Sequence, residues 1–118
     1  MTDADLSVAW PAVLKQGEDP ELLPIMDLAQ WKQYQVDQAW HSSDTDQLID
    51  RNGALYRLSL EGSTVRLNRQ QPDLTLTDVL GLVKAHMAQA GSCCVAKLYA
   101  PTIADALQLL IDQDLSAR

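Results

Sequence analysis

Two adjacent cysteines are the residues of this chain most able to do covalent chemistry. Cys93 and Cys94 could act as a redox pair, as soft-metal ligands or as a nucleophile, and His86 could supply an imidazole partner. Zinc sites need spacings such as C-x2-C with H-x3–5-H, which the chain lacks. A free cysteine on an apolar strand usually packs as a small hydrophobe. We therefore expect structural cysteines, no metal, no cofactor and no assignable catalytic residue, with a thiol enzyme or redox sensor as an alternative.

A group of arginines could bind an anion. Residues 51–69 contain four arginines and one acid, whereas the fifty residues before them contain ten acids and two lysines. The guanidinium group donates paired hydrogen bonds to carboxylates and phosphates. Arg57 and Arg66 alternate with apolar residues, and Lys97 and Tyr99 follow the same alternation in a later segment. These four residues form a candidate anion-binding sheet face. The alternative is that they are simply solvated, and that their charges discourage pairing at the sheet edge.

A predicted antiparallel meander over residues 47–69 would position Arg57 and Arg66. Asn52-Gly53 stands between two apolar runs, and this pair favours a hairpin because both residues tolerate a positive φ. Strict alternation on either side indicates one buried face and one exposed face. We expect two C-terminal helices to cover the buried face. The residues expected to point toward them are Tyr56, Leu58, Val65 and Leu67.

Two helix-start motifs define the last third of the chain. Thr75-Leu76-Thr77-Asp78 and Thr102-Ile103-Ala104-Asp105 both match the [ST]-x-x-[DE] capping pattern, and apolar residues at helical spacing follow each motif. Gly91 is placed to end the first helix. Between them, Cys93 to Tyr99 predicts a strand that joins the sheet. The fold class expected is α+β, an antiparallel-dominated sheet with two C-terminal helices packed on one face.

The first forty residues are less regular. Ser7 to Leu14 predicts an edge strand, because Pro11 cannot donate a ladder hydrogen bond. Glu21 to Ile25 could return as its partner, and a short helix should run from Leu28 to about Val36. The three tryptophans all fall in this region, and we expect them to cover the open side or an edge of the sheet.

Length and charge narrow the class of protein. A chain of 118 residues suits one domain over 1–118, with residues 1–6 loose. The net charge of −7 opposes binding to nucleic acid or to an anionic membrane surface, and no apolar run is long enough to span a bilayer. The start lacks the basic and apolar regions of a signal peptide, so we expect a cytoplasmic protein.

The Trp10-Pro11-Ala12 start and the Cys93-Cys94-Val95-Ala96-Lys97-Leu98-Tyr99-Ala100-Pro101 run resemble a small family of gammaproteobacterial proteins of unknown function. The resemblance covers most of the chain and implies a bacterial cytoplasm, but it implies no catalytic or binding residue. We expect a non-enzymatic interaction or regulatory module acting through a sheet face or edge strand. Its partner would be another protein or a second copy in a homodimer, and a small anionic-ligand binder is the first alternative.

Overall fold

An antiparallel sheet organises the computed structural model, which describes residues 7–38, 45–61, 64–89, 91 and 98–116. The strands are β1 (Ala12–Lys15), β2 (Leu22–Ile25), β3 (Gln47–Ile49), β4 (Leu55–Glu61) and β5 (Thr64–Gln70). The helices are α2 (Leu28–Gln38), α3 (Leu76–Gln89) and α4 (Ile103–Ser116). The strand order is β2-β1-β3-β4-β5, with every neighbouring pair antiparallel. The predicted α+β class and the 47–69 meander are confirmed.

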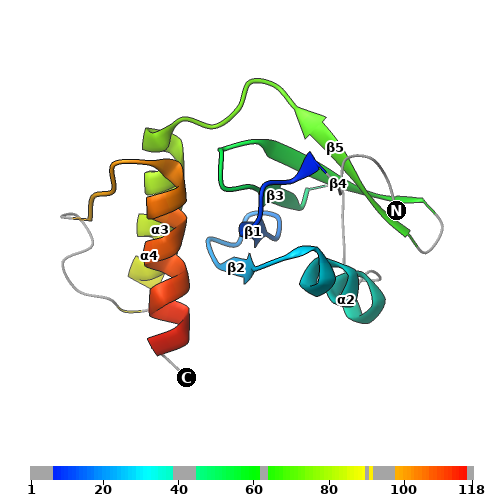
Figure 1. Cartoon of the computed structure of the whole chain (residues 1–118), viewed down its shortest axis with the longest axis horizontal. Coiled ribbons are helices and arrows are strands. Elements are labelled where there is room, and N and C mark those ends of the chain that lie inside the picture. The colour runs from blue at the N-terminus through cyan, green and yellow to red at the C-terminus, as the bar shows by residue number, and fades with distance from the viewer. Residues whose placement is uncertain (1–6, 39–44, 62–63, 90, 92–97, 117–118) are drawn as a thin grey trace.

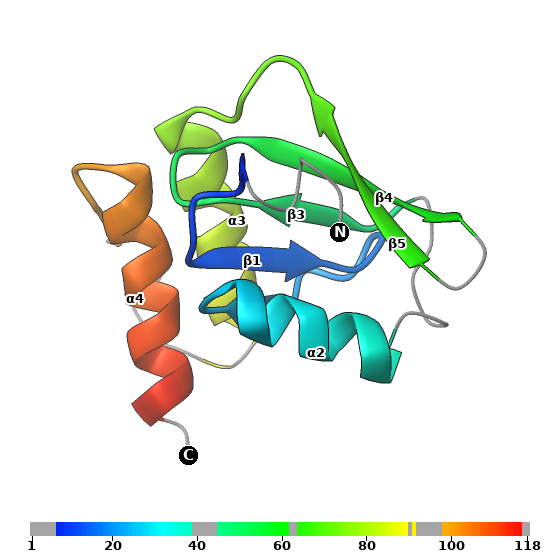
Figure 2. The same ribbon diagram turned by 45° about the vertical axis from the view of Figure 1, so that its right-hand side comes forward.

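Helices pack on both faces of the sheet (Figure 1). On one face α2 contributes Trp31 and Tyr34 to a core with Leu14 and Tyr56. On the other face α3 and α4 lie side by side at one end of the sheet and run in the same direction (Figure 2). They cover Val13 and Ile49 with residues of their own, namely Val79, Val83, Met87, Ala106, Leu107 and Leu110. The two C-terminal helices therefore share one face, as predicted.

The buried residues of the meander face α2, and the expectation that they face the C-terminal helices is wrong. Tyr56, Leu58, Val65 and Leu67 are all buried in the core that contains Trp31. Alternation shows which side chains leave the solvent, but it does not show which helix covers them. Here α2 provides the cover, because its two large aromatic side chains supply the apolar surface that this face of the sheet needs.

A buried carboxylate fixes the turn between β3 and β4. Asp50 is 2% exposed, and its side chain accepts hydrogen bonds from the backbone N–H groups of Ala9, Asn52 and Ala54 at 3.1, 2.9 and 2.9 Å. Gly53 follows with a φ of +87°, so the Asn-Gly hairpin prediction is confirmed. Asp50 thus ties the segment before β1 to the turn, satisfying backbone donors that burial would otherwise leave unpaired.

The edge strand is β2, and the prediction that Ser7 to Leu14 forms an edge strand is wrong. Pro11 precedes β1, which lies between β2 and β3. Its missing N–H is therefore no obstacle to pairing on both sides. The expected partner strand is confirmed as β2, and it carries Pro24 at the edge, where a residue without an N–H is tolerated.

Both predicted helix caps are present. Thr75 Oγ1 accepts from the Asp78 N–H at 3.2 Å, and the Asp78 carboxylate accepts from the Thr75 N–H at 3.0 Å. The bond that the Thr75 backbone N–H donates to the Asp78 carboxylate, together with a hydrogen bond from the Thr75 side chain, lowers the pKa of Asp78 below its ordinary value. The Asp105 N–H likewise donates to Thr102 Oγ1 at 3.1 Å at the start of α4. Gly91, with a φ of +85°, follows the end of α3.

Candidate binding surface on the open sheet face

Arg57 and Arg66 lie where the sheet extends beyond its helical cover. Arg57 pairs with Asn68 and Arg66 pairs with Ser59 across β4 and β5, so all four side chains share one face. By alternation this is the face on which α3 and α4 cover Ile49, and not the opposite one. Both arginines are nevertheless exposed. They sit on the helical face, but on the part that the helices leave open.

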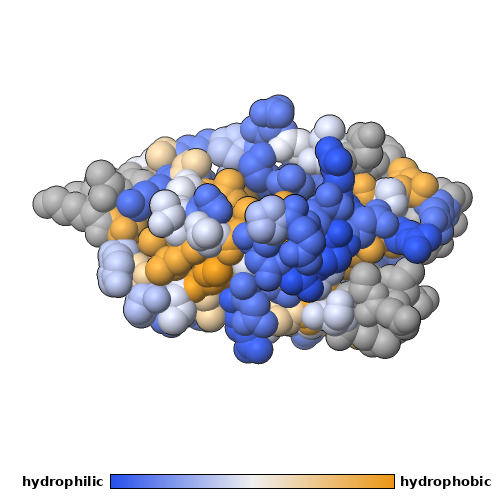
Figure 3. All heavy atoms as spheres, turned by 90° about the horizontal axis from the view of Figure 1, so that it is seen from above, coloured by the Kyte–Doolittle hydropathy of each residue, from blue (hydrophilic) through white to orange (hydrophobic). Residues whose placement is uncertain are grey.

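Strand register groups six polar residues on this surface, which we call the open face. Lys15, Gln47, Arg57 and Asn68 form one row across four strands, and Ser59 and Arg66 form the next. None of the six is buried. Asn68 Nδ2 donates to Ser59 Oγ at 2.9 Å, which holds two of the polar groups in place between the arginines. Figure 3 views the molecule from above the β5 edge of Figure 1, and it shows a hydrophilic band beside an apolar area at the helical end.

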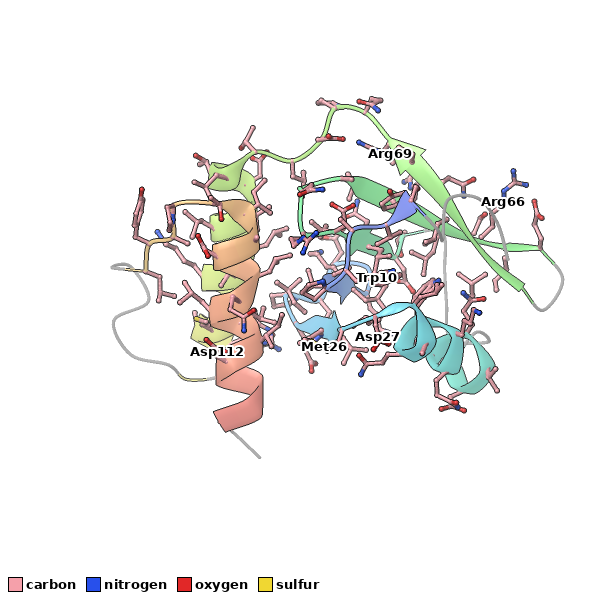
Figure 4. All side chains as sticks on the ribbon, viewed as in Figure 1. Trp10, Met26, Asp27, Arg66, Arg69 and Asp112 are labelled. Atoms are coloured by element: carbon pink, nitrogen blue, oxygen red, sulfur yellow. The ribbon has the colours of Figure 1, made fainter. Side chains whose placement is uncertain are left out.

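The arginines of β5 make ion pairs that are open to solvent. Arg66 meets Glu61 at 2.7 Å, with side chains 50% and 62% exposed, and Arg69 meets Asp73 at 2.7 Å. The hydrogen bond that Arg69 donates to the Asp73 carboxylate raises the pKa of the Arg69 guanidinium above its ordinary value. Figure 4 shows both arginines on β5, away from α3 and α4. Exposed pairs of this kind are worth about 0–1 kcal/mol, so an incoming carboxylate can exchange for Glu61 or Asp73.

Tyr99 does not join Arg57 and Arg66. Leu98–Ala100 form no strand, and this segment lies on the side of α3 and α4 that faces away from the sheet (Figures 1 and 2). The Tyr99 side chain is 73% exposed there. Lys97 lies outside the described residues, and so do residues 93–96 of the predicted strand. The structure therefore brings together two of the four predicted site residues.

His86 holds the edge strand through its side chain. The Leu22 N–H donates to His86 Nδ1 at 2.9 Å, which joins β2 to α3 across 64 residues of sequence. This bond requires an unprotonated Nδ1. Cys93 and Cys94 lie outside the described residues, so the thiol–imidazole couple stays a prediction. Sequence reasoning missed the role of His86, since only the fold brings it to Leu22.

A shallow groove between β2 and α2 was also missed. It encloses about 180 Å³ and is lined by Leu23, Pro24, Ile25, Gln30, Gln33, Tyr34 and Asp37. Leu23 and Met26 beside it are each 44% exposed. The sequence signal for this groove was Leu23, an apolar residue at a solvent-facing position of an edge strand. The sequence does not show that α2 forms the second wall.

Among the described residues, no three His, Cys, Asp or Glu side chains are grouped as metal ligands. No described helix has the length and apolar character needed to cross a bilayer.

Comparison with known proteins gives a family and a structural relative. A solved structure described as the NMR structure of the protein from Shewanella amazonensis is similar over 90% of each chain, with 29% sequence identity and a TM-score of 0.68. No curated protein matches the sequence. The family DUF4144, described as a protein structure with unknown function, matches residues 10–110. Since that match spans most of the sequence, the chain belongs to the DUF4144 family.

Proposed function

We propose that this domain is a non-enzymatic interaction module that binds an acidic protein partner through the open face. The observation that carries the proposal is the pair Arg57 and Arg66, exposed on adjacent strands and on one face, in the only stretch of the chain with a clear excess of cations. Each guanidinium can donate paired hydrogen bonds to a carboxylate. An acidic surface would therefore find two forked donors on a rigid sheet.

The charge distribution supports an oriented encounter. Residues 51–69 carry four arginines against Glu61 alone, while the chain as a whole carries −7. An acidic partner is repelled by most of the molecule and attracted to the β4–β5 hairpin, which favours one binding orientation.

The proposal includes a cytoplasmic location. The adjacent residues Cys93 and Cys94 support this location, because neighbouring cysteines are poorly placed to form a disulfide.

The double variant Arg57→Gln/Arg66→Gln should weaken binding of poly-L-glutamate at least about tenfold, because each arginine offers charge-assisted hydrogen bonds. The measurement is fluorescence anisotropy with a labelled polymer at low and at physiological salt. Lys32→Gln/Lys84→Gln is the matched control, since it removes the same charge from α2 and α3 and should change affinity less than about twofold. Glu61→Gln releases Arg66 and should tighten binding about twofold to fivefold.

Equal loss of affinity in the two double variants would contradict the proposal, because binding would then follow net charge alone. Inorganic phosphate serves as a competitor in the same assay. If phosphate binds with the same dependence on Arg57 and Arg66 and displaces the polymer at similar concentration, the surface is a small-anion site and the protein-partner proposal fails.

A further inference from the structure

The two edges of the sheet differ in their outward backbone N–H groups. An edge strand normally presents such donors to solvent, where they can pair with a strand of another chain. In an antiparallel sheet the residues of each strand bond alternately to one side and to the other. The outward residues of β2 and β5 can therefore be identified from the bonds of their neighbours.

At the β2 edge every outward N–H is satisfied or absent. The Leu22 N–H donates to His86 Nδ1 at 2.9 Å, and the Met26 N–H, just after the strand, donates to Gln30 Oε1 at 2.6 Å. Between them stands Pro24, which has no N–H. Residues from α3 and α2 thus close this edge, and an added strand would find no donor on it.

At the β5 edge three N–H groups point outward. The Leu58 N–H donates to the Asp46 carbonyl on the β3 side of β4, so Arg57 and Ser59 bond toward β5 and their partners Asn68 and Arg66 bond back. Val65, Leu67 and Arg69 therefore turn their N–H and C=O groups to the outside. In the described part of the chain no acceptor meets these three N–H groups.

The side chains of β5 determine which kind of strand can pair with its outer edge. Val65 and Leu67 are buried, so they anchor β5 while its outer backbone stays available. Arg66 lies on the open face and Arg69 on the other, where its guanidinium stands 5.7 Å from the centre of the Tyr56 ring. A second β5 would bring the arginines of two copies together, and like charges on paired strands destabilise them. An acidic strand meets opposite charge instead.

We infer that an extended acidic segment of the partner protein adds to the sheet as a sixth strand along β5. The inference rests on the proposed function and specifies its geometry. The outward groups of Val65, Leu67 and Arg69 would form the new ladder. Carboxylates at alternate positions of the segment would meet Arg66 on the open face, with Arg57 one strand behind it.

The test uses two synthetic peptides with alternating glutamate and valine, identical except that the second is N-methylated at every inner residue. N-methylation keeps the charges but prevents strand pairing. The unmodified peptide should bind at least about tenfold more tightly, since N-methylation removes the backbone hydrogen bonds that it would form with β5. Its binding should slow amide hydrogen exchange at Val65, Leu67 and Arg69 and leave Leu22 unchanged.

The outcomes separate this inference from the proposed function. If both peptides bind equally and both lose affinity in Arg57→Gln/Arg66→Gln, the edge inference is overturned and the face-binding function stands. If neither peptide binds, both fail. If exchange at Val65, Leu67 and Arg69 slows with protein concentration and no peptide present, the occupant is a second copy and the acidic-segment inference is wrong.

Discussion

Replacing Trp31 with alanine is expected to lower the free energy of unfolding by about 3–5 kcal/mol. Trp31 is fully buried, stacks on Tyr34 with ring centroids 5.4 Å apart and lies 6.5 Å from the Trp10 ring. It is the largest side chain in the core between α2 and the sheet, so truncation removes apolar contact and leaves a cavity. Urea denaturation followed by far-ultraviolet circular dichroism measures the change.

Two variants of α2 sharpen this prediction. Val36→Ala removes a side chain that is 79% exposed and should shift stability by no more than about 0.5 kcal/mol. Trp31 Nε1 is buried without a hydrogen-bond partner among the described residues, so Trp31→Phe keeps an aromatic ring while removing an unpaired donor. It should retain most of the stability. Similar losses in Trp31→Ala and Val36→Ala would contradict the assignment of this core.

The second large effect is expected at Gly53, where alanine should cost about 2–4 kcal/mol. The φ of +87° is unfavourable for any residue with a Cβ, and that atom would stand 2.6 Å from the Leu74 carbonyl oxygen and 2.7 Å from Ile103 Cδ1. The Leu74 N–H also donates to the Gly53 carbonyl at 2.8 Å. The turn between β3 and β4 thus contacts the segments that begin α3 and α4, and the same denaturation experiment reports its loss.

Gly81→Ala is the matched control for Gly53. A Cβ at Gly81 meets nothing within 4 Å, and the residue lies in the middle of α3. Alanine there should raise stability by about 0.5–1 kcal/mol, because glycine is the poorer helix former. If both substitutions destabilise the protein alike, the close approach at Gly53 is not what sets its cost.

Local chemistry explains what could be predicted from the sequence. Thr75 with Asp78, Thr102 with Asp105, and the Asn52-Gly53 turn act over a few residues, so their patterns determined the helix starts and the hairpin. Alternation likewise identified the buried side chains of β4 and β5. On the candidate surface it placed Arg57 and Arg66 correctly as exposed neighbours on adjacent strands.

Long-range packing explains what could not be predicted. The alternation of apolar and polar residues does not show whether α2 or α3 covers a given face of the sheet. The burial of Tyr56 was therefore assigned to the wrong helices. The bond from Leu22 to His86 and the bond from Ala9 to Asp50 join segments 64 and 41 residues apart. The closed β2 edge and the open β5 edge arise from such contacts, so neither could be read from the residue order.

Residue-resolved amide hydrogen exchange on the free protein tests the open edge most directly. Along β5, exchange should alternate, with Arg66 and Asn68 slow because they bond to β4, and Val65, Leu67 and Arg69 fast. At the other edge Leu22 should be slow because His86 accepts its N–H. If Val65, Leu67 and Arg69 exchange as slowly as Arg66 and Asn68 in a dilute monomeric sample, the β5 edge is already paired and cannot receive a partner strand.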